Sequence, residues 1–464
     1  MNVLWIVNKY VKVNDYEYFY FYFLHYVKLE LLKNNIEINY ITFSDNISDS
    51  PFSNEILFYE DYTNIDSHNI SEIALELEHK YKFTFKQSYF SDLLQTLKSR
   101  REIDVPEDKF NKLSELVPKF LYLENLISNN KYDIIFSDVS PEVEMEFARI
   151  LGNYYGVKVI KDNEGAFLGR SIFNKLLNFG EEELIEVDLG NGMPKENISY
   201  FIDNFIKNKD KPYLKRVFTT DNLTFKKKFL NLVRYNNLYS FLYGKLISFL
   251  HKIEHDIIKN FFIDKFDKSQ NYFFLGLHLN QESTMSLRAQ PFTNQVVLAE
   301  MLSRVLPANY LLYVREHPHW PETYKLSYLL KFRKLNNVRL ISCDIPIHDI
   351  IEHSKGLLTY NATTTIESLM YGKPVLTFSS NIYYKYHAEV DYCNNMYDLG
   401  EKLTQLLFKS ISKDETINYM FKLFNYSHVI SLSSYSFLSI DDAYQKASLF
   451  SNYLKRVFLH VLNE

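Results

Sequence analysis

Cysteine is scarce in this chain, whose 464 residues include only Cys343 and Cys393. Two thiols cannot build a disulfide framework or a cysteine-based zinc site, and such low usage fits a reducing compartment. An excess of basic charge is also lacking, because the formal net charge is −5 at pH 7. No global positive field is therefore present to hold a nucleic-acid backbone, and we expect no nucleic-acid partner.

Long apolar runs are missing as well. The sequence contains no uncharged apolar run of about 18 residues, the length that a membrane-spanning helix needs. Its first residues, 1–7, have no basic stretch before them and no small-residue cleavage site after them, so we interpret them as a β-strand and not as a signal peptide. We expect a cytoplasmic protein, or one that is peripheral on the cytoplasmic face of the inner membrane.

Several catalytic signatures are absent. The sequence has no D-x-D, H-E-x-x-H, Walker A, G-x-S-x-G or G-x-G-x-x-G pattern. Metal-dependent transfer, hydride transfer and serine hydrolysis therefore lose support. We expect no metal and no cofactor.

What the sequence does contain is an ordinary globular composition, 46% hydrophobic and 23% charged, and enough length for two domains. Short apolar runs alternate with helix-length segments, which predicts βαβ units and parallel sheets. The expected strands are 3–7, 38–43, 133–137, 157–161, 272–277, 310–314, 338–342, 356–359 and 374–378. This pattern predicts two doubly wound, Rossmann-like α/β domains that face a central cleft.

The alternation of strand and helix patterns is interrupted by a stretch rich in Lys, Phe and Leu, and this change sets the expected domain limits. We assign 1–205 to a first Rossmann-like domain and 206–268 to a helical insertion or bridge. We assign 269–440 to a second Rossmann-like domain and 441–464 to a helix that packs back toward the first domain. Ligands of such sheets lie beyond the carboxyl ends of the strands, so the chemistry is expected in the segments that follow strands.

The first candidate segment follows the expected strand 310–314 and contains Arg315, His317 and Pro318. A histidine held by a following proline at a strand end can donate a hydrogen bond to a phosphate and stabilise it as it leaves. The alternative is a histidine that only caps a loop.

The second candidate segment lies between the expected strands 356–359 and 374–378. Asn361 and the hydroxyls of Thr363, Thr364 and Thr365 fall where a helix begins, an arrangement suited to an anion such as phosphate. Glu367 follows on the first turn, where its carboxylate could accept hydrogen bonds from two ribose hydroxyls. The alternative is a capping box between Thr364 and Glu367, which needs no ligand.

The third candidate segment follows the expected strand 157–161 and reads Asp162, Asn163, Glu164, Gly165. A carboxylate on a strand-end loop, beside a glycine that lets substrate approach, is placed to act as a general base or nucleophile. The alternative is a solvated turn. The alternating glutamates 142, 144 and 146 upstream are expected to be a solvated helix start.

The fourth candidate segment, 277–288, follows the first strand of the second domain. It gathers several polar side chains that could line the cleft, although an ordinary loop is an equal alternative. The residues that we single out are His278, Gln281, Ser283 and Arg288.

Together these segments resemble the GT-B glycosyltransferases of bacterial surface polysaccharides that use CMP-activated sugars. The closest resemblance is to the capsule polysaccharide biosynthesis family that includes Kdo transferases, with a more distant similarity to bacterial sialyltransferases. It rests on an acidic-Gly-x-Phe-Leu-x-Arg-Ser pattern from Glu164 to Ser171 with Ala166 as one extra residue, on the HP pair 317–318 and on the Ser/Thr motif 363–365. The matching segments are 157–172 and 272–380. Asn163 stands where the sialyltransferase pattern prefers a second acid, so the choice between Glu164 and Asp162 stays open.

The resemblance implies transfer of a CMP-linked ulosonic acid, of the Kdo, sialic or pseudaminic type, to a surface-polysaccharide or glycolipid acceptor without a metal. His317 and the threonines 363–365 would hold the departing phosphate, Glu367 the ribose, and backbone groups near 342–346 the cytosine. Glu164 or Asp162 would deprotonate the acceptor hydroxyl, or attack the sugar. Further donor contacts would come from Arg315, Pro318, Asn361, His278, Gln281 and Ser283, and substrate contacts from Gly165, Arg170 and Arg288.

Three rival functions remain open from the sequence. On the same fold these are a CDP-glycerol-type polyol phosphotransferase and a UDP-sugar transferase. From a different class comes a non-catalytic polysaccharide assembly subunit, which the 16% aromatic content would suit through sugar stacking. The segment 211–268 alternates basic with apolar residues, which predicts either a membrane-surface helix or an interdomain helix pair with solvated lysines.

Overall fold

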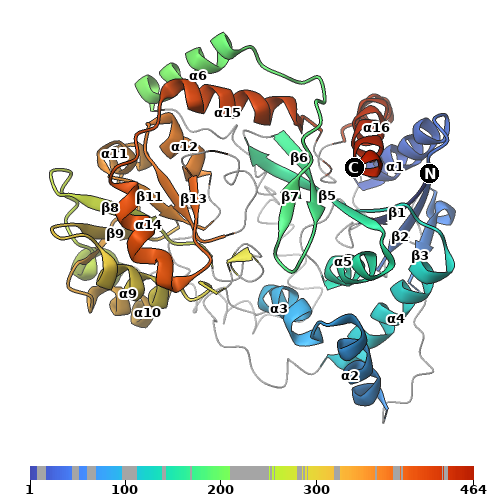
Figure 1. Cartoon of the computed structure of the whole chain (residues 1–464), viewed down its shortest axis with the longest axis horizontal. Helices are drawn as coiled ribbons and strands as arrows, with labels where there is room; N and C mark the ends of the chain where they lie inside the picture. The colour runs from blue at the N-terminus through green and yellow to red at the C-terminus, as the bar shows by residue number, and fades with distance from the viewer. Residues whose placement is uncertain are drawn as a thin grey trace, which may run out of the picture.

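The computed structural model of the chain describes most of its length. The described residues are 1–7, 17–43, 52–59, 69–96, 112–137, 143–167, 170–209, 250, 253–254, 256–279, 285, 288–289, 291–317, 324–360, 363–379, 387, 390–430, 432 and 437–464. Within them the chain forms two separate β-sheets, each flanked by helices (Figure 1). Most of the expected helical bridge 206–268 lies outside the described residues.

The first sheet has the strand order β14-β6-β5-β4-β1-β2-β3, with β7 paired to β6. The strands β1 to β5 run parallel to their neighbours, whereas β6, β7 and β14 are added antiparallel. Their bounds are Asn2–Val7 (β1), Glu37–Thr42 (β2), Ile56–Phe58 (β3), Ile134–Ser137 (β4), Lys158–Phe167 (β5), Arg170–Leu176 (β6), Glu182–Leu184 (β7) and Ser427–His428 (β14).

Both faces of the first sheet are buried, as the side chains of β1 show. Val3 and Trp5 belong to the core beneath α1 and α16, while Leu4 and Ile6 belong to the core beneath α2 to α5. Because successive side chains of a strand point to opposite faces, helices must cover both sides. The helices are α1 (Glu17–Leu32), α2 (Ile70–Tyr81), α3 (Phe85–Thr96), α4 (Leu113–Asn129), α5 (Val143–Tyr155) and α16 (Ile440–Asn463).

The second sheet has the order β10-β9-β8-β11-β12-β13 and is parallel throughout. Its strands are β8 (Tyr272–Gly276), β9 (Leu311–Arg315), β10 (Val338–Ile341), β11 (Leu357–Thr359), β12 (Val375–Thr377) and β13 (Val390–Tyr392). Tyr272 and Phe274 face one core, and Phe273 and Leu275 face the other. This sheet is therefore doubly wound as well.

Helices from three parts of the chain cover the second sheet. Residues of α6 and α15 join the core that contains Tyr272, and residues of α9, α10 and α14 join the opposite core. Their bounds are α6 (Lys195–Asn208), α9 (Gln295–Val305), α10 (Leu326–Arg333), α11 (Ile347–His353), α12 (Thr364–Met370), α14 (Leu399–Leu406) and α15 (Lys413–Asn425). The prediction of two doubly wound α/β domains is thus confirmed.

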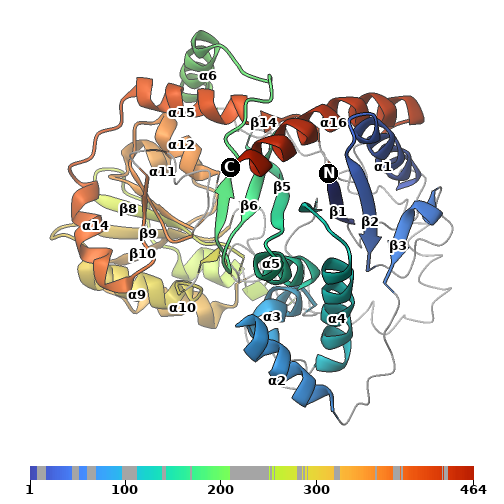
Figure 2. The same ribbon diagram turned by 45° about the vertical axis from the view of Figure 1, so that its right-hand side comes forward.

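The end of the chain returns to the first sheet. After α15, the short strand β14 pairs with β6, and α16 then packs against α1 (Figure 2). Residues 427–428 therefore belong to the first sheet, although the expected second domain extends to 440. No helix in the described part of the chain is both long and apolar enough to cross a membrane.

Nine expected strands are confirmed, each to within a few residues, but the third candidate segment differs from its prediction. The expected loop after residue 161 is instead a continuation of β5 as far as Phe167. It continues because β6 pairs with it antiparallel, with Asp162 opposite Phe173 and a register shift between Asn163 and Phe167. The candidate base therefore lies on a hairpin that extends beyond the parallel strands.

Candidate active site

The carboxyl ends of the central strands of the second sheet lie side by side. Arg315, the last residue of β9, pairs with Gly276 at the end of β8 and with Ile341 at the end of β10. Leu358 of β11 pairs with Leu275 of β8. The segments that follow these strands therefore leave the sheet at one edge, and the described donor-binding candidates lie there, at a strand end or in the residues that follow it.

Arg315 is the best-defined polar group at this edge. It is buried, its Nη1 donates a 3.0 Å hydrogen bond to the carbonyl of Ile345, and its guanidinium lies 5.5 Å from the ring centre of Phe274. Its buried Nε has no hydrogen-bond partner among the described residues. Arg315 therefore holds the segment 342–346, which was expected to contact cytosine, and its Nε–H is available to a ligand.

The histidine of the HP pair lies directly beyond this arginine. His317 is half-buried and follows the buried Glu316, whose carbonyl oxygen lies 3.6 Å from the Sγ of Cys343. Pro318 lies outside the described residues. His317 therefore lies two residues beyond Arg315 at the same edge of the sheet.

The threonine segment begins the short helix α12. Thr363 is the N-cap and makes no side-chain capping bond, so the capping box between Thr364 and Glu367 is not formed. Thr365 is fully buried, and its hydroxyl has no hydrogen-bond partner among the described residues. A buried polar atom without a partner is costly, and such atoms in native proteins call for a specific explanation.

Glu367, on the first turn of α12, also has a buried polar atom without a hydrogen-bond partner among the described residues. The side chain is 5% exposed, and its Oε2 has no hydrogen-bond partner in the described part of the chain. Burial raises the pKa of Glu367 to about 7, although the positive charge of Arg315 opposes this shift. A carboxylate with this pKa is held close to the arginine and carries an unused acceptor.

His278 is held mainly through its backbone. Its N–H donates to the Oε1 of Gln295 at 2.8 Å, and its carbonyl accepts hydrogen bonds from Gln295 Nε2 and from the Tyr324 hydroxyl. Its ring contacts that of Tyr360. The strand exit is thus fixed, while the other expected donor contacts of this and the threonine segment, Gln281, Ser283 and Asn361, lie outside the described residues.

On the first sheet, the two candidate acids have different positions. Glu164 and Gly165 lie in β5 within the stretch where its register with β6 shifts, and their side chains lie outside the described part. Such irregularities often redirect a side chain next to an active site. Asp162 is fully buried and lies 3.1 Å from the Nε2 of His428 in β14, so in this conformation it contacts protein and not solvent.

Arg170, expected to contact substrate, joins distant parts of the chain. Its guanidinium donates hydrogen bonds to the Ser427 hydroxyl at 2.6 Å and to the carbonyl of Asn191 at 2.8 Å, and it lies over the ring of Phe424. Burial lowers the pKa of this arginine. These contacts give Arg170 a role in holding the chain crossover between α15 and β14.

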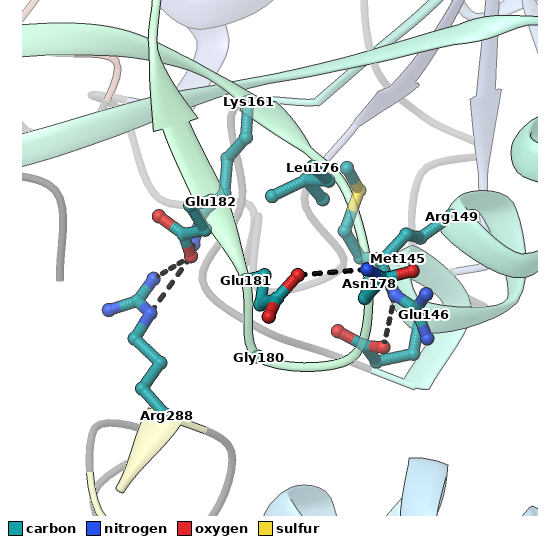
Figure 3. Close-up of a pocket in the computed structure, with 10 residues that line it drawn as sticks. All are labelled: Met145, Glu146, Arg149, Lys161, Leu176, Asn178, Gly180, Glu181, Glu182 and Arg288. Carbon is teal, nitrogen blue, oxygen red and sulfur yellow. Dashed lines mark hydrogen bonds and ion pairs between the residues drawn. The ribbon is translucent and has the colours of Figure 1, made fainter. Parts of the chain in front are cut away.

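Arg288, the other expected substrate contact, forms a buried ion pair with Glu182 of β7 (Figure 3). Lys161 of β5 lies 3.9 Å from the same carboxylate. Burial lowers the pKa of Lys161 to about 8, while the negative charge of Glu182 opposes the shift. These side chains line a cavity of about 20 Å³, which has room for water but not for a sugar.

Sequence reasoning missed several of the residues that fix this arrangement. Each of these residues forms a hydrogen bond with a candidate residue, although it lies outside the four candidate segments. They are Glu182, Gln295, Ser427 and His428. No local pattern marks them, because their partners are brought together only by the fold. The prediction of a solvated helix start is wrong for Glu144 and Glu146, which are buried on α5, while Glu142 lies outside the described residues.

Comparison with known proteins gives one match to a family model. Residues 208–386 match the model described as "Capsule polysaccharide biosynthesis protein". A search of curated proteins gave no match. The matched range includes the strand ends of β8, β9, β10 and β11 and the whole of α12, and therefore the donor side of the candidate site.

Solved structures with a related chain course were also found, all at low similarity. The Kdo 2,7 transferase structure of KpsC from Thermosulfurimonas dismutans is 11% identical, with a TM-score of 0.33, over 70% of this chain and 88% of that one. UDP-GlcNAc 2-epimerase from Neisseria meningitidis is 13% identical, with a TM-score of 0.26, over 96% and 98%. A glycosyltransferase from Rickettsia africae is 12% identical, with a TM-score of 0.25, over 99% and 97%.

These TM-scores are too low for the neighbours' activities to be carried over to this chain. The family match does not depend on them, because it rests on the sequence of a continuous segment. The HP pair, the threonine motif and the segment after β8 all fall inside that segment. The predicted resemblance to the capsule polysaccharide biosynthesis family is therefore confirmed for residues 208–386.

Proposed function

We propose that this protein is a glycosyltransferase that moves a CMP-activated ulosonic acid, of the Kdo, sialic or pseudaminic type, onto a surface-polysaccharide or glycolipid acceptor. The observation that carries the proposal is the set of buried polar atoms without partners at one edge of the second sheet. Among the described residues this set includes the Nε of Arg315, the hydroxyl of Thr365 and the Oε2 of Glu367. A nucleoside monophosphate offers oxygens to the first two and ribose hydroxyls to the third.

In this proposal the donor side stabilises the leaving group. Arg315, His317 and the threonines 363–365 donate hydrogen bonds to the phosphate of CMP as it leaves the sugar. Donors that are already fixed stabilise developing charge without reorganisation. Since a CMP-linked sugar already carries a phosphate as its leaving group, the proposed reaction does not depend on a metal.

Glu367 binds the ribose in the same proposal. Its pKa near 7 leaves a substantial carboxylate fraction at neutral pH, and a carboxylate forms strong hydrogen bonds to hydroxyl donors. The carbonyls of the segment 342–346 read the cytosine, although the carbonyl of Ile345 already accepts a hydrogen bond from Arg315. The cytosine contacts are therefore assigned to the other backbone groups of this segment.

The base is assigned to Glu164 and not to Asp162. Asp162 is enclosed and paired with His428, whereas Glu164 lies further along the hairpin, where the pairing of β5 becomes irregular. Glu164 deprotonates the acceptor hydroxyl, or attacks the sugar if the configuration is retained. A lipid-linked acceptor near the membrane would fit the basic and apolar segment 211–268.

Calorimetric titration of the protein with CMP, CDP, UDP and GDP tests the nucleotide preference. We expect CMP to bind at least 10-fold more tightly than UDP, about the difference of one well-made hydrogen bond to a base edge. Incubation with CMP-Kdo, CMP-sialic acid and CMP-pseudaminic acid then identifies the sugar. Preference for UDP would contradict the CMP assignment, and absence of nucleotide binding would favour an assembly subunit.

A further inference from the structure

Glu182 connects the two halves of the molecule through a single carboxylate. It lies in β7, at the edge of the first sheet, and its partner Arg288 lies between β8 and α9 of the second sheet. Both side chains are only 10% exposed. Figure 3 shows the arginine rising from a separate segment of the chain to meet this carboxylate.

The two oxygens of this carboxylate serve different parts of the chain. Oε1 accepts hydrogen bonds from the Nε of Arg288, at 2.8 Å, and from its Nη2. Oε2 accepts hydrogen bonds from the Nδ2 of Asn163, at 3.2 Å, and of Asn174, at 3.0 Å. Oε1 therefore reaches Arg288 of the second half and also lies 3.9 Å from the Nζ of Lys161 in β5, while Oε2 holds β5 and β6.

Asn163 links the ion pair of Glu182 and Arg288 to the strand that carries Glu164. It is the last residue of regular β5–β6 pairing before the register shift, and Glu164 follows it directly. The hydrogen bond from Asn163 to Glu182 therefore fixes the strand at the point from which Glu164 departs. A shift of about 1 Å in a catalytic group can cost roughly 100-fold in rate.

The charges around Glu182 favour its ionised form. Burial alone would raise the pKa of Glu182, but the charges of Arg288 and Lys161 outweigh it and hold the pKa below its usual range. Removal of one partner from such a buried pair leaves an uncompensated charge, whereas replacement of a whole pair by apolar groups is often tolerated. A buried pair is thus a weak source of stability but a strict constraint on geometry.

We propose that Glu182 is a positioning residue through which Arg288 of the donor side fixes the hairpin that carries the candidate base. In this arrangement Glu164 is in place only while the two halves are in contact. The inference rests on the proposed function for the identity of the base, but the coupling of Arg288 to the hairpin does not.

Hydrogen exchange followed by mass spectrometry tests the coupling without any substrate. In Arg288→Met we expect the amides of residues 160–174 to exchange at least 10-fold faster than in the wild type, although the substitution is in the other half. Glu182→Gln should give the same pattern, and the double variant no more than either alone. If the amides of the hairpin exchanged in Arg288→Met at the same rate as in the wild type, the proposal would be overturned. Arg288→Met alone still tests the coupling if Glu182→Gln fails to fold.

Kinetics with a CMP-sugar test the consequence for transfer. Glu182→Gln should lower kcat by roughly 10- to 100-fold while the Kd for CMP stays within about 2-fold, because the phosphate-binding groups are on the second sheet. Glu182→Asp, which keeps the charge, should recover part of the loss.

Glu146→Gln is the matched control. It removes a carboxylate that lines the same cavity but pairs with Arg149 within α5. It therefore also leaves a buried cation without its partner and can lower stability, but hairpin exchange and kcat should stay close to the wild type because its ion pair lies within α5. An equal loss of kcat in Glu146→Gln, or a parallel loss of CMP affinity in Glu182→Gln, would overturn the positioning role. Absence of transfer by the wild type with every donor would instead overturn the proposed function, and with it the identity of the base, while leaving the exchange result intact.

Discussion

The two halves of the candidate site use their buried polar side chains in different ways. In the second sheet, Thr365 and Glu367 each keep a buried oxygen without a hydrogen-bond partner among the described residues. In the first sheet, Arg170 is bonded to Ser427 and Glu182 to Arg288, and one oxygen of Asp162 is bonded to His428 while its Oδ2 has no partner among the described residues. In the proposed function, the second sheet is the donor side and has polar groups available for a ligand, whereas the first sheet is the acceptor side and uses most of these polar groups to hold the chain in place.

This difference separates binding from positioning. Polar groups without protein partners lower stability and gain their hydrogen bonds only when a ligand arrives. Paired groups give no binding energy to a ligand, but they fix the strand that carries the base. Changes on the donor side should therefore act on nucleotide affinity and stability together, and changes on the acceptor side should act on turnover.

The largest expected effect is that of the base itself. Glu164→Gln should lower kcat by roughly 1,000-fold, in the range for loss of a general base, while the Kd for CMP stays unchanged. Initial-rate kinetics and calorimetry measure the two quantities. Glu183→Gln removes a partly exposed carboxylate near this hairpin, paired with Lys175, and should behave as the wild type. Comparable losses in both variants would remove the acceptor-side assignment.

The next effect comes from the leaving-group side. His317→Ala should lower kcat by about 100-fold or more, as expected when one fixed donor to a departing oxyanion is lost. His460→Ala, on α16 and bonded to Glu464, serves as the control and should leave turnover unchanged. An unaltered kcat in His317→Ala would show that the imidazole takes no part in departure of CMP.

The buried carboxyl of Glu367 should make the free energy of unfolding depend on pH. Because its pKa is about 7 in the folded protein and 4.5 in the unfolded chain, the folded state keeps a proton that the unfolded chain has lost between these values. The free energy of unfolding therefore falls as the pH rises from 4.5 to 7. Glu367→Gln removes this loss, so the variant should gain stability over the wild type by up to about 3 kcal/mol above pH 7, at about 1.4 kcal/mol for each pH unit.

The same substitution should weaken CMP binding by roughly 10-fold, because an amide accepts weaker hydrogen bonds than a carboxylate. Urea unfolding between pH 4.5 and 8, together with calorimetry, measures both effects. Glu300→Gln, on an exposed part of α9, gives the reference. If the difference in the free energy of unfolding between Glu367→Gln and the wild type did not change with pH, Glu367 would not have a raised pKa in the folded protein.

The smallest effect distinguishes two buried threonine hydroxyls on neighbouring helices. Thr365 has no hydrogen-bond partner in the described part of the chain, whereas Thr416 donates to the carbonyl of Leu369 at 3.1 Å. Thr365→Val should therefore raise the free energy of unfolding by about 1 kcal/mol, and Thr416→Val should lower it by about 1 kcal/mol. CMP affinity should fall only in Thr365→Val. The two substitutions should therefore change the free energy of unfolding in opposite directions. A change in the same direction would contradict the assignment of Thr365 as a hydroxyl without a protein partner.

The sequence was informative where periodicity decides the structure. The runs that became β1, β4, β8 and β9 are buried on both faces, and such strands read as continuous apolar segments. The donor side follows from these strands, because parallel strands bring the segments after their carboxyl ends to one edge. Arg315 and Glu367 could therefore be placed near one another from sequence alone.

The acceptor side could not be predicted in this way. Asp162 and Lys161 have charges that usually favour solvent, yet both are buried because His428 and Glu182 lie against them. These partners are distant in sequence, and no local pattern announces them. Extension of β5 into a hairpin likewise depends on antiparallel pairing with β6, and this pairing turned an expected loop into a strand.

A crystal structure of the protein with bound CMP would show whether the second sheet holds the nucleotide as proposed. We expect the phosphate within hydrogen-bonding distance of Arg315 and Thr365, and the ribose hydroxyls at Glu367. Phosphate bound at another surface, with these three side chains still without a ligand, would contradict it.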